Sequence, residues 1–212
     1  MRRERLQTIV GLVAALAAGS SCGEVARTGS SPVYLIIDQL TGARGGTTSG
    51  TPSGTLASDV ITNVTSPEPC SPKTPCPTVF SDSGQAQFRV APRDVTTSGT
   101  PTAPTTNSDV TIRRYRVSYR RADGRNTPGV DVPYGFDGAV TGTVRCCGPQ
   151  QTFGFELVRN VAKEEPPLVQ LISSATIITT IADVTFYGHD QVGNSVNAVG
   201  SIQIDFGNFG DQ

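Results

Sequence analysis

Residues Thr176 to Phe206 read TIITTIADVTFYGHDQVGNSVNAVGSIQIDF, and this stretch decides the fold. On both sides of the central Asp190-Gln-Val-Gly-Asn194 segment, a row of apolar residues falls at even positions: Ile178, Ala182, Val184, Phe186, Val196, Ala198, Ile202, Ile204 and Phe206. A period of two predicts strands with one buried face, and the central segment has the composition of a tight turn. Because a hairpin alone is marginal in water, we expect other strands to cover this apolar face.

Short strand-like segments occur along the rest of the chain, separated by turns rich in Gly, Pro, Ser and Thr. The clearest is Gly84–Ala91, in which Ala86, Phe88 and Val90 share one face. Altogether we count about eight or nine short strands, a pattern typical of an antiparallel sandwich or barrel. For Glu156–Glu165 two interpretations remain, a strand, which we favour, and a helical turn ended by Pro166-Pro167.

The segment Asp109–Arg121 changes phase along its length. Val110 and Ile112 have even numbers, whereas Tyr115, Val117 and Tyr119 have odd numbers. Since one regular strand cannot bury both sets on the same side, the pattern predicts a β-bulge near Arg113 and Arg114, or a strand that bends from one sheet to another.

The N-terminus has the features of an export signal. Three arginines among the first five residues precede an apolar run, Leu6 to Ala18, which is too short to span a bilayer. Small residues then lead to Cys22, an arrangement that resembles the lipobox of bacterial lipoproteins, although Gly19 stands where a Leu is usual. The resemblance implies that residues 1–21 are removed, that Cys22 is acylated, and that residues 22–31 form a tether before a domain at 32–212. In that family Gly23, rather than Asp, after the cysteine favours the outer membrane.

Charge and cysteine content agree with export. Loss of residues 1–21 removes three arginines and one glutamate and takes the net charge from −1 to −3, which does not favour nucleic acid as a partner. Of the five cysteines, four remain once Cys22 is acylated, and an even set in an oxidising compartment suggests disulfides. We favour Cys70–Cys76, which closes a small Pro-rich loop. Cys146 and Cys147 would then form a vicinal bridge, unless the four cysteines cross-link distant strands.

Two further patterns resemble a known fold family. The Asp190-x-x-Gly-Asn194 turn between alternating strands is similar to the last hairpin of bacterial immunoglobulin-like and fibronectin type III-like domains. The Tyr115-x-Val-x-Tyr119 pattern is similar to the third strand of fibronectin type III-like domains. The resemblance implies an all-β, immunoglobulin-like β-sandwich with long Gly/Ser/Thr/Pro-rich loops. It implies no activity, because such sandwiches serve mostly as spacers, adhesion modules and binding platforms.

One basic stripe is a candidate binding surface. Arginines alternate with tyrosines along one segment, and the candidate ligand-binding residues there are Arg114, Tyr115, Arg116, Tyr119 and Arg121. Such a stripe could bind an acidic glycan or another anionic ligand. The alternative is an exposed strand face, on which arginines discourage pairing with another sheet edge.

Candidates for metal binding and catalysis are few. Oxygen ligands near the last hairpin make Asp183, Asp190, Asn194 and Asp205 weak calcium candidates, although Asp and Asn also stabilise turns by themselves. His189 is the only histidine, so a Ser-His-Asp or Cys-His site would have to be built on it, in a turn. We therefore expect no enzyme and no cofactor. The chain is predicted to be a lipid-anchored envelope protein with a structural or protein-interaction role, and the alternative is a carbohydrate- or anion-binding module that uses residues 113–121.

Overall fold

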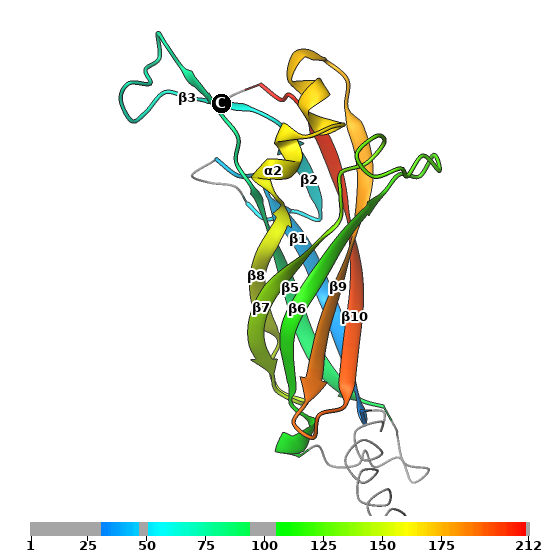
Figure 1. The fold of residues 1–212 in the computed structure, drawn as a ribbon. Helices are drawn as coiled ribbons and strands as arrows, with labels where there is room; N and C mark the ends of the chain where they lie inside the picture. Colours follow the sequence, from blue (N-terminus) through cyan, green and yellow to red (C-terminus); the bar gives the residue numbers. More distant parts are fainter. Residues whose placement is uncertain (1–30, 47–50, 94–104, 211–212) are drawn as a thin grey trace, which may run out of the picture.

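The computed structural model describes residues 31–46, 51–93 and 105–210, which form two main sheets and a small hairpin (Figure 1). The first sheet has the order β1-β5-β8, with bounds Val33–Ala43, Asp82–Pro92 and Gln151–Val158. The second has the order β2-β10-β9-β6-β7, with bounds Thr55–Asp59, Ser195–Gly207, Ile178–Asp190, Val110–Arg120 and Phe136–Val144. The hairpin pairs β3 (Thr62–Val64) with β4 (Cys76–Thr78). The all-β class is therefore confirmed.

The predicted C-terminal hairpin is confirmed as β9 and β10. Its register pairs Phe186 with Ala198 and Ala182 with Ile202, so the even-numbered side chains point to one side. Of the predicted apolar face, Ile178 at the strand end is partly buried and the other residues are buried. β6 pairs antiparallel with β9, and β2 pairs parallel with β10, so the hairpin lies in the middle of its sheet.

The predicted bulge in β6 is also confirmed. The register with both neighbouring strands shifts between Ile112 and Arg114. Relative to β9, Arg113 is the extra residue, whereas relative to β7 the extra residue lies on β7. Val110 and Ile112 before the shift and Tyr115, Val117 and Tyr119 after it are all buried. The bulge thus keeps the apolar residues of both phases on the core side of one strand.

The core lies between the two main sheets. The ring of Phe88 on β5 meets that of Phe186 on β9 edge-on, with centroids 4.8 Å apart. Phe155 on β8 packs in the same manner against Phe186, at 5.2 Å, and against Tyr115, at 5.1 Å. Edge-to-face pairs at these separations are favourable beyond their buried area. Aromatic side chains from both sheets therefore hold the sheets face to face.

The interpretation of Glu156–Glu165 as a strand was wrong for its second half. β8 ends at Val158, and Asn160–Glu164 forms the short helix α2, followed by the 3₁₀ helix η3 at Leu168–Ser173. A further 3₁₀ turn, η2, spans Thr106–Ser108. The physical reason is packing: α2 turns the chain so that Lys163 is buried beside Asp82, and the following η3 buries Leu168 and Leu171.

The two ends of the elongated body differ (Figure 1). At the lower end in that view, β1 begins beside the β9–β10 turn, and η2 lies close by. At the upper end lie α2, the C-terminal residues and a projecting arm, which we define as residues 61–81 and which contains β3 and β4. The strands between run along the length of the body, so the start of β1 and the arm are at opposite ends.

Candidate functional site

The tyrosines of the predicted basic stripe face the core. Tyr115 is 3% exposed and Tyr119 is 7% exposed. The Tyr119 hydroxyl donates a hydrogen bond to the carbonyl of Leu157 at 2.8 Å, and the N–H of Glu156 donates one to the Tyr115 hydroxyl at 3.2 Å. Burial raises the pKa of both phenols. These tyrosines therefore link β6 to β8 across the sandwich interior and are not at the surface.

The arginines of the stripe are exposed but paired with carboxylates. The nitrogen–oxygen distances are 3.5 Å for Arg114–Asp137, 2.9 Å for Arg116–Asp137, 2.6 Å for Arg120–Asp183 and 2.7 Å for Arg121–Asp123. The Arg114 guanidinium also lies 3.9 Å from the centroid of the Tyr187 ring. The structure thus does not bring the five predicted residues, Arg114, Tyr115, Arg116, Tyr119 and Arg121, together on one surface.

The calcium candidates lie apart along the hairpin. Asp183 accepts hydrogen bonds from Ser201, at 2.5 Å, and from Arg120, and Asp205 accepts one from Thr179 at 2.7 Å. Asp183 and Asp190 are seven positions apart on β9, which corresponds to roughly 23 Å at the rise of an extended strand. Within the described residues, no group of three or more His, Cys, Asp or Glu side chains is placed to hold a metal ion.

Asp190 and Asn194 instead organise the turn. One Asp190 carboxylate oxygen accepts the N–H groups of Val192, at 3.1 Å, and Asn194, at 2.8 Å, and the other accepts the Asn194 side-chain amide at 2.8 Å. Burial raises the pKa of Asp190, but these hydrogen bonds and one from Ser31 outweigh it, so the pKa lies below its usual value. Gly193 supplies the positive φ of +99° that the turn requires.

The cysteines behave differently from one another. Cys70 and Cys76 form the favoured disulfide, with Cα atoms 5.4 Å apart. Cys146 and Cys147 are unbridged, with their sulfur atoms 2.8 Å apart, and Cys147 has a φ of +61°. A cross-link between the two pairs is therefore excluded in this structure. Cys22 and residues 1–21 lie outside the described residues.

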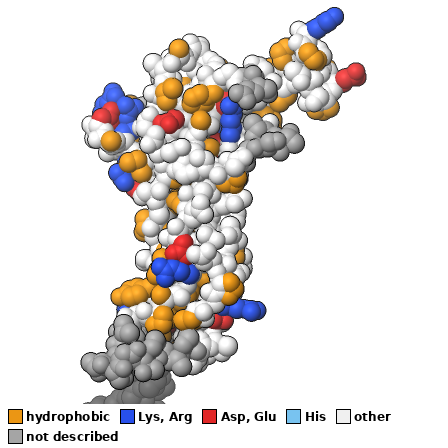
Figure 2. Space-filling model, turned by 180° about the vertical axis from the view of Figure 1, so that it is seen from behind, with side chains coloured by type: hydrophobic (Ala, Val, Ile, Leu, Met, Phe, Trp, Pro, Cys, Tyr) orange, Lys and Arg blue, Asp and Glu red, His pale blue; other side chains and the backbone are white. Residues whose placement is uncertain are grey.

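The Cys70–Cys76 disulfide lies within the projecting arm. Figure 2 shows this arm standing away from the body at the upper end. None of residues 61–81 is buried, so this segment has no apolar core of its own. Ser71 and Thr74 exchange two backbone hydrogen bonds at 3.0 Å, which closes a turn with Pro72 and Lys73 at its tip. The disulfide and this turn give the arm a fixed shape that apolar burial cannot supply there.

A buried ion pair that the sequence did not indicate lies at the upper end of the body, next to α2 (Figure 1). The Lys163 ammonium is 2.9 Å from the Asp82 carboxylate, and their side chains are 1% and 0% exposed. The same carboxylate accepts hydrogen bonds from the Ser58 hydroxyl at 2.6 Å and from the Gly45 N–H at 2.8 Å. Burial lowers the pKa of Lys163, and the charge of Asp82 opposes that shift. The ion pair joins α2 to β5, and the hydrogen bond from Ser58 joins β2 to the same carboxylate.

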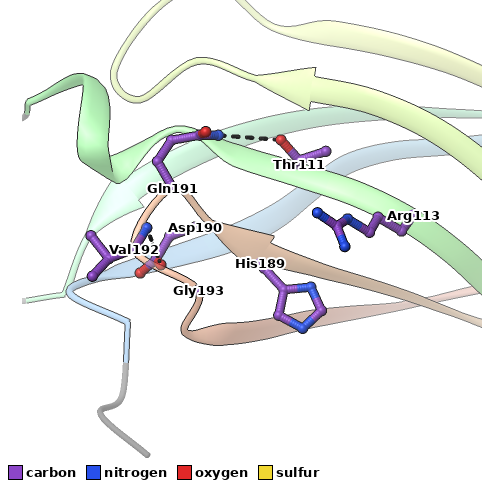
Figure 3. Close-up of a pocket in the computed structure, with 7 residues that line it drawn as sticks. All are labelled: Thr111, Arg113, His189, Asp190, Gln191, Val192 and Gly193. Carbon is purple, nitrogen blue, oxygen red and sulfur yellow. Dashed lines mark hydrogen bonds between the residues drawn. The ribbon is translucent and has the colours of Figure 1, made fainter. Parts of the chain in front are cut away.

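A polar pocket lies at the lower end, between the first half of β6 and the β9–β10 turn (Figure 3). Its volume is about 530 Å³. The residues that line it are Thr111, Arg113, His189, Asp190, Gln191, Val192 and Gly193. The Gln191 amide donates to the Thr111 hydroxyl at 3.2 Å and to the carbonyl of Asp109 at 3.3 Å, which fixes one wall. The β6 bulge places Arg113 at this pocket.

Comparisons with known proteins give no family for this chain. No protein-family model matches it, and no curated protein is significantly similar to it. In the part of the chain that the structure describes, no helix has the length and apolar composition needed to cross a membrane. The function of the chain therefore has to be inferred from the geometry described above.

Proposed function

We propose that the protein is a lipid-anchored envelope protein with one immunoglobulin-like β-sandwich, and that it has a structural or protein-interaction role without catalysis. The sandwich proposal is supported by two facing sheets of three and five strands, whose neighbouring strands are antiparallel except for β2 and β10. It is also supported by the paired aromatic residues between the sheets. The anchor proposal is supported by the N-terminal residues up to Cys22.

The observation that carries the interaction role is the position of the arm. The arm projects from the end opposite to the start of β1 (Figure 1). An anchor at Cys22 lies nine residues before Ser31, so it would hold the lower end near the membrane and present the arm to the far side. Apart from Ile61, no apolar residue of this disulfide-closed arm packs against the core, and none is fully buried, so its fixed shape is explained best by contact with a partner.

The arm tip offers a defined surface to such a partner. Pro72 and Lys73 stand at the centre of the turn closed by Ser71 and Thr74. Glu68 and Lys73 are the only charged residues of the arm, and both are exposed. A rigid tip that presents a cation at a fixed position loses little conformational entropy on binding. The partner would be an envelope protein or glycan.

Photo-crosslinking in the producing cell tests this role. A photoreactive amino acid at Lys73 should give an adduct of one defined mass, and the same amino acid at Val199, which is 60% exposed on β10, should give none. Replacing both Cys70 and Cys76 by Ser should weaken the Lys73 adduct, because the arm then loses its fixed shape. Equal labelling at the two positions, or none at Lys73, would contradict the interaction role.

A further inference from the structure

The pocket at the lower end contains a cation that has no carboxylate partner in the described part of the chain. Arg114, Arg116, Arg120, Arg121 and Arg125 each form an ion pair with an aspartate. Arg113 lines the pocket, and within the described residues it has neither an ion pair nor a hydrogen bond. It is the extra residue of β6 relative to β9, so no residue of β9 lies directly opposite it. The bulge therefore leaves one guanidinium facing the pocket.

The second unpartnered group is the imidazole of His189. Its Nδ1 atom is buried and, within the described residues, has no hydrogen-bond partner. A buried polar group without a partner costs about 1–3 kcal/mol, so its presence in a folded protein calls for an explanation. In Figure 3 the Arg113 and His189 side chains extend from neighbouring strands toward the same space. One ligand could satisfy both groups if the His189 ring turns to bring its buried Nδ1 atom to the pocket.

The remaining lining adds little opposing charge. Among the lining residues that the structure describes, Asp190 is the only carboxylate, and both of its oxygens already accept hydrogen bonds from Val192 or Asn194. The Gln191 amide donates to the Thr111 hydroxyl, so these two side chains already bond to each other on their side of the pocket. The groups that remain available to a ligand are the N–H donors of the Arg113 guanidinium and a ring nitrogen of His189. This combination suits an acceptor that carries negative charge on more than one oxygen.

We propose that this pocket binds an oxyanion, a phosphate or carboxylate group of a small polar molecule, between the Arg113 guanidinium and the His189 imidazole. The guanidinium bonds two oxygens of the group, and a ring N–H of His189 donates to one of them. The volume of about 530 Å³ is within the range of small-molecule sites and leaves room for the rest of such a molecule. The inference is independent of the anchor and of the arm.

The test uses the only histidine of the chain as its reporter. The ring carbon–proton signals of His189 in an NMR spectrum need no assignment among histidines, and the Gly193 amide reports from the turn. We expect saturable shifts of both signals on titration with inorganic phosphate or with glucuronate, and none with glucose, which lacks the charge. Phosphate and glucuronate separately show which oxyanion is preferred.

Two variants complete the test. Arg113→Ala should weaken binding at least about tenfold, because it removes the charged bidentate contact. Arg116→Ala removes the same charge from the same strand outside the pocket, and it should change affinity less than about twofold. If Arg113→Ala disturbs the amide spectrum elsewhere, Arg113→Gln replaces it. The proposal is overturned if neither anion gives a saturable shift, or if the Arg113 and Arg116 variants bind equally well.

Discussion

The sandwich body and the arm are stabilised in opposite ways. In the body, the two sheets bury apolar side chains such as Phe88, Phe186 and Phe206, each with 0% exposure. In the arm, none of residues 61–81 is buried, and the Cys70–Cys76 disulfide closes the loop covalently. A segment that is kept exposed needs a covalent constraint, because exposure removes the hydrophobic term. Body and arm should therefore respond to different perturbations.

The largest effect is expected in the centre of the body. Phe186→Ala removes a ring that packs against Phe88, Phe155 and Tyr115, and it should lower the free energy of unfolding by about 3–5 kcal/mol. Urea unfolding measures this loss. Val199→Ala on the other face of the same hairpin should cost less than about 0.5 kcal/mol. Similar losses for the two variants would contradict the assigned core face.

The next effect concerns the buried ion pair at the upper end of the body. Lys163→Met leaves the Asp82 carboxylate buried without its cation, so we expect a loss of about 3 kcal/mol. Adding Asp82→Asn should recover part of that loss, since the uncompensated charge is then removed. Urea unfolding of both variants checks this. A Lys163→Met protein as stable as the wild type would show that the pair is not buried as described.

Reduction of the disulfide should affect the arm and spare the body. Opening the loop of Cys70–Cys76 releases conformational entropy worth about 2 kcal/mol in the arm. Amide hydrogen exchange should accelerate at Ser71 and Thr74, while the exchange of β9 and β10 amides stays unchanged. The Cys70→Ser/Cys76→Ser variant should reproduce the result without reductant. Faster exchange throughout the body would mean that the two regions are not independent.

The smallest effect is expected at the β9–β10 turn, which is fixed by hydrogen bonds rather than by a disulfide. Asp190→Ala removes acceptors for Val192 and Asn194 and should cost about 1–2 kcal/mol. The pKa of Asp190 is lowered in the folded state, so its contribution is fully present above the unfolded pKa and is lost as pH falls through the folded pKa. The wild type should therefore lose stability below about pH 4, and the variant should lose less there.

Much of the body was predictable because its signals are local. The even-numbered apolar row gave the face and turn of β9–β10, and the change of phase near Arg113 gave the bulge. Cys70 and Cys76 are close in the sequence, and that pairing is confirmed. The same alternation places Tyr115 and Tyr119 with Val117 on the buried face, so they could have been excluded from a surface stripe.

The rest depends on contacts between distant residues. Lys163 and Asp82 are 81 positions apart, and nothing in either neighbourhood of the sequence indicates a buried pair. Likewise the parallel pairing of β2 with β10, which aligns Leu56 with Ile204, has no local pattern. The pocket arises because the bulge and the turn meet at one end of the sheet, so its lining appears only once the register is known.

The most direct test of the account is the intact mass, without reduction, of the protein purified from membranes of the producing cell. We predict a chain that starts at Cys22 and carries added acyl mass, in which Cys70 and Cys76 resist alkylation until they are reduced. That result would support an anchor at one end of the molecule and a disulfide-closed arm at the other. A soluble chain without lipid, or free thiols at Cys70 and Cys76, would contradict it.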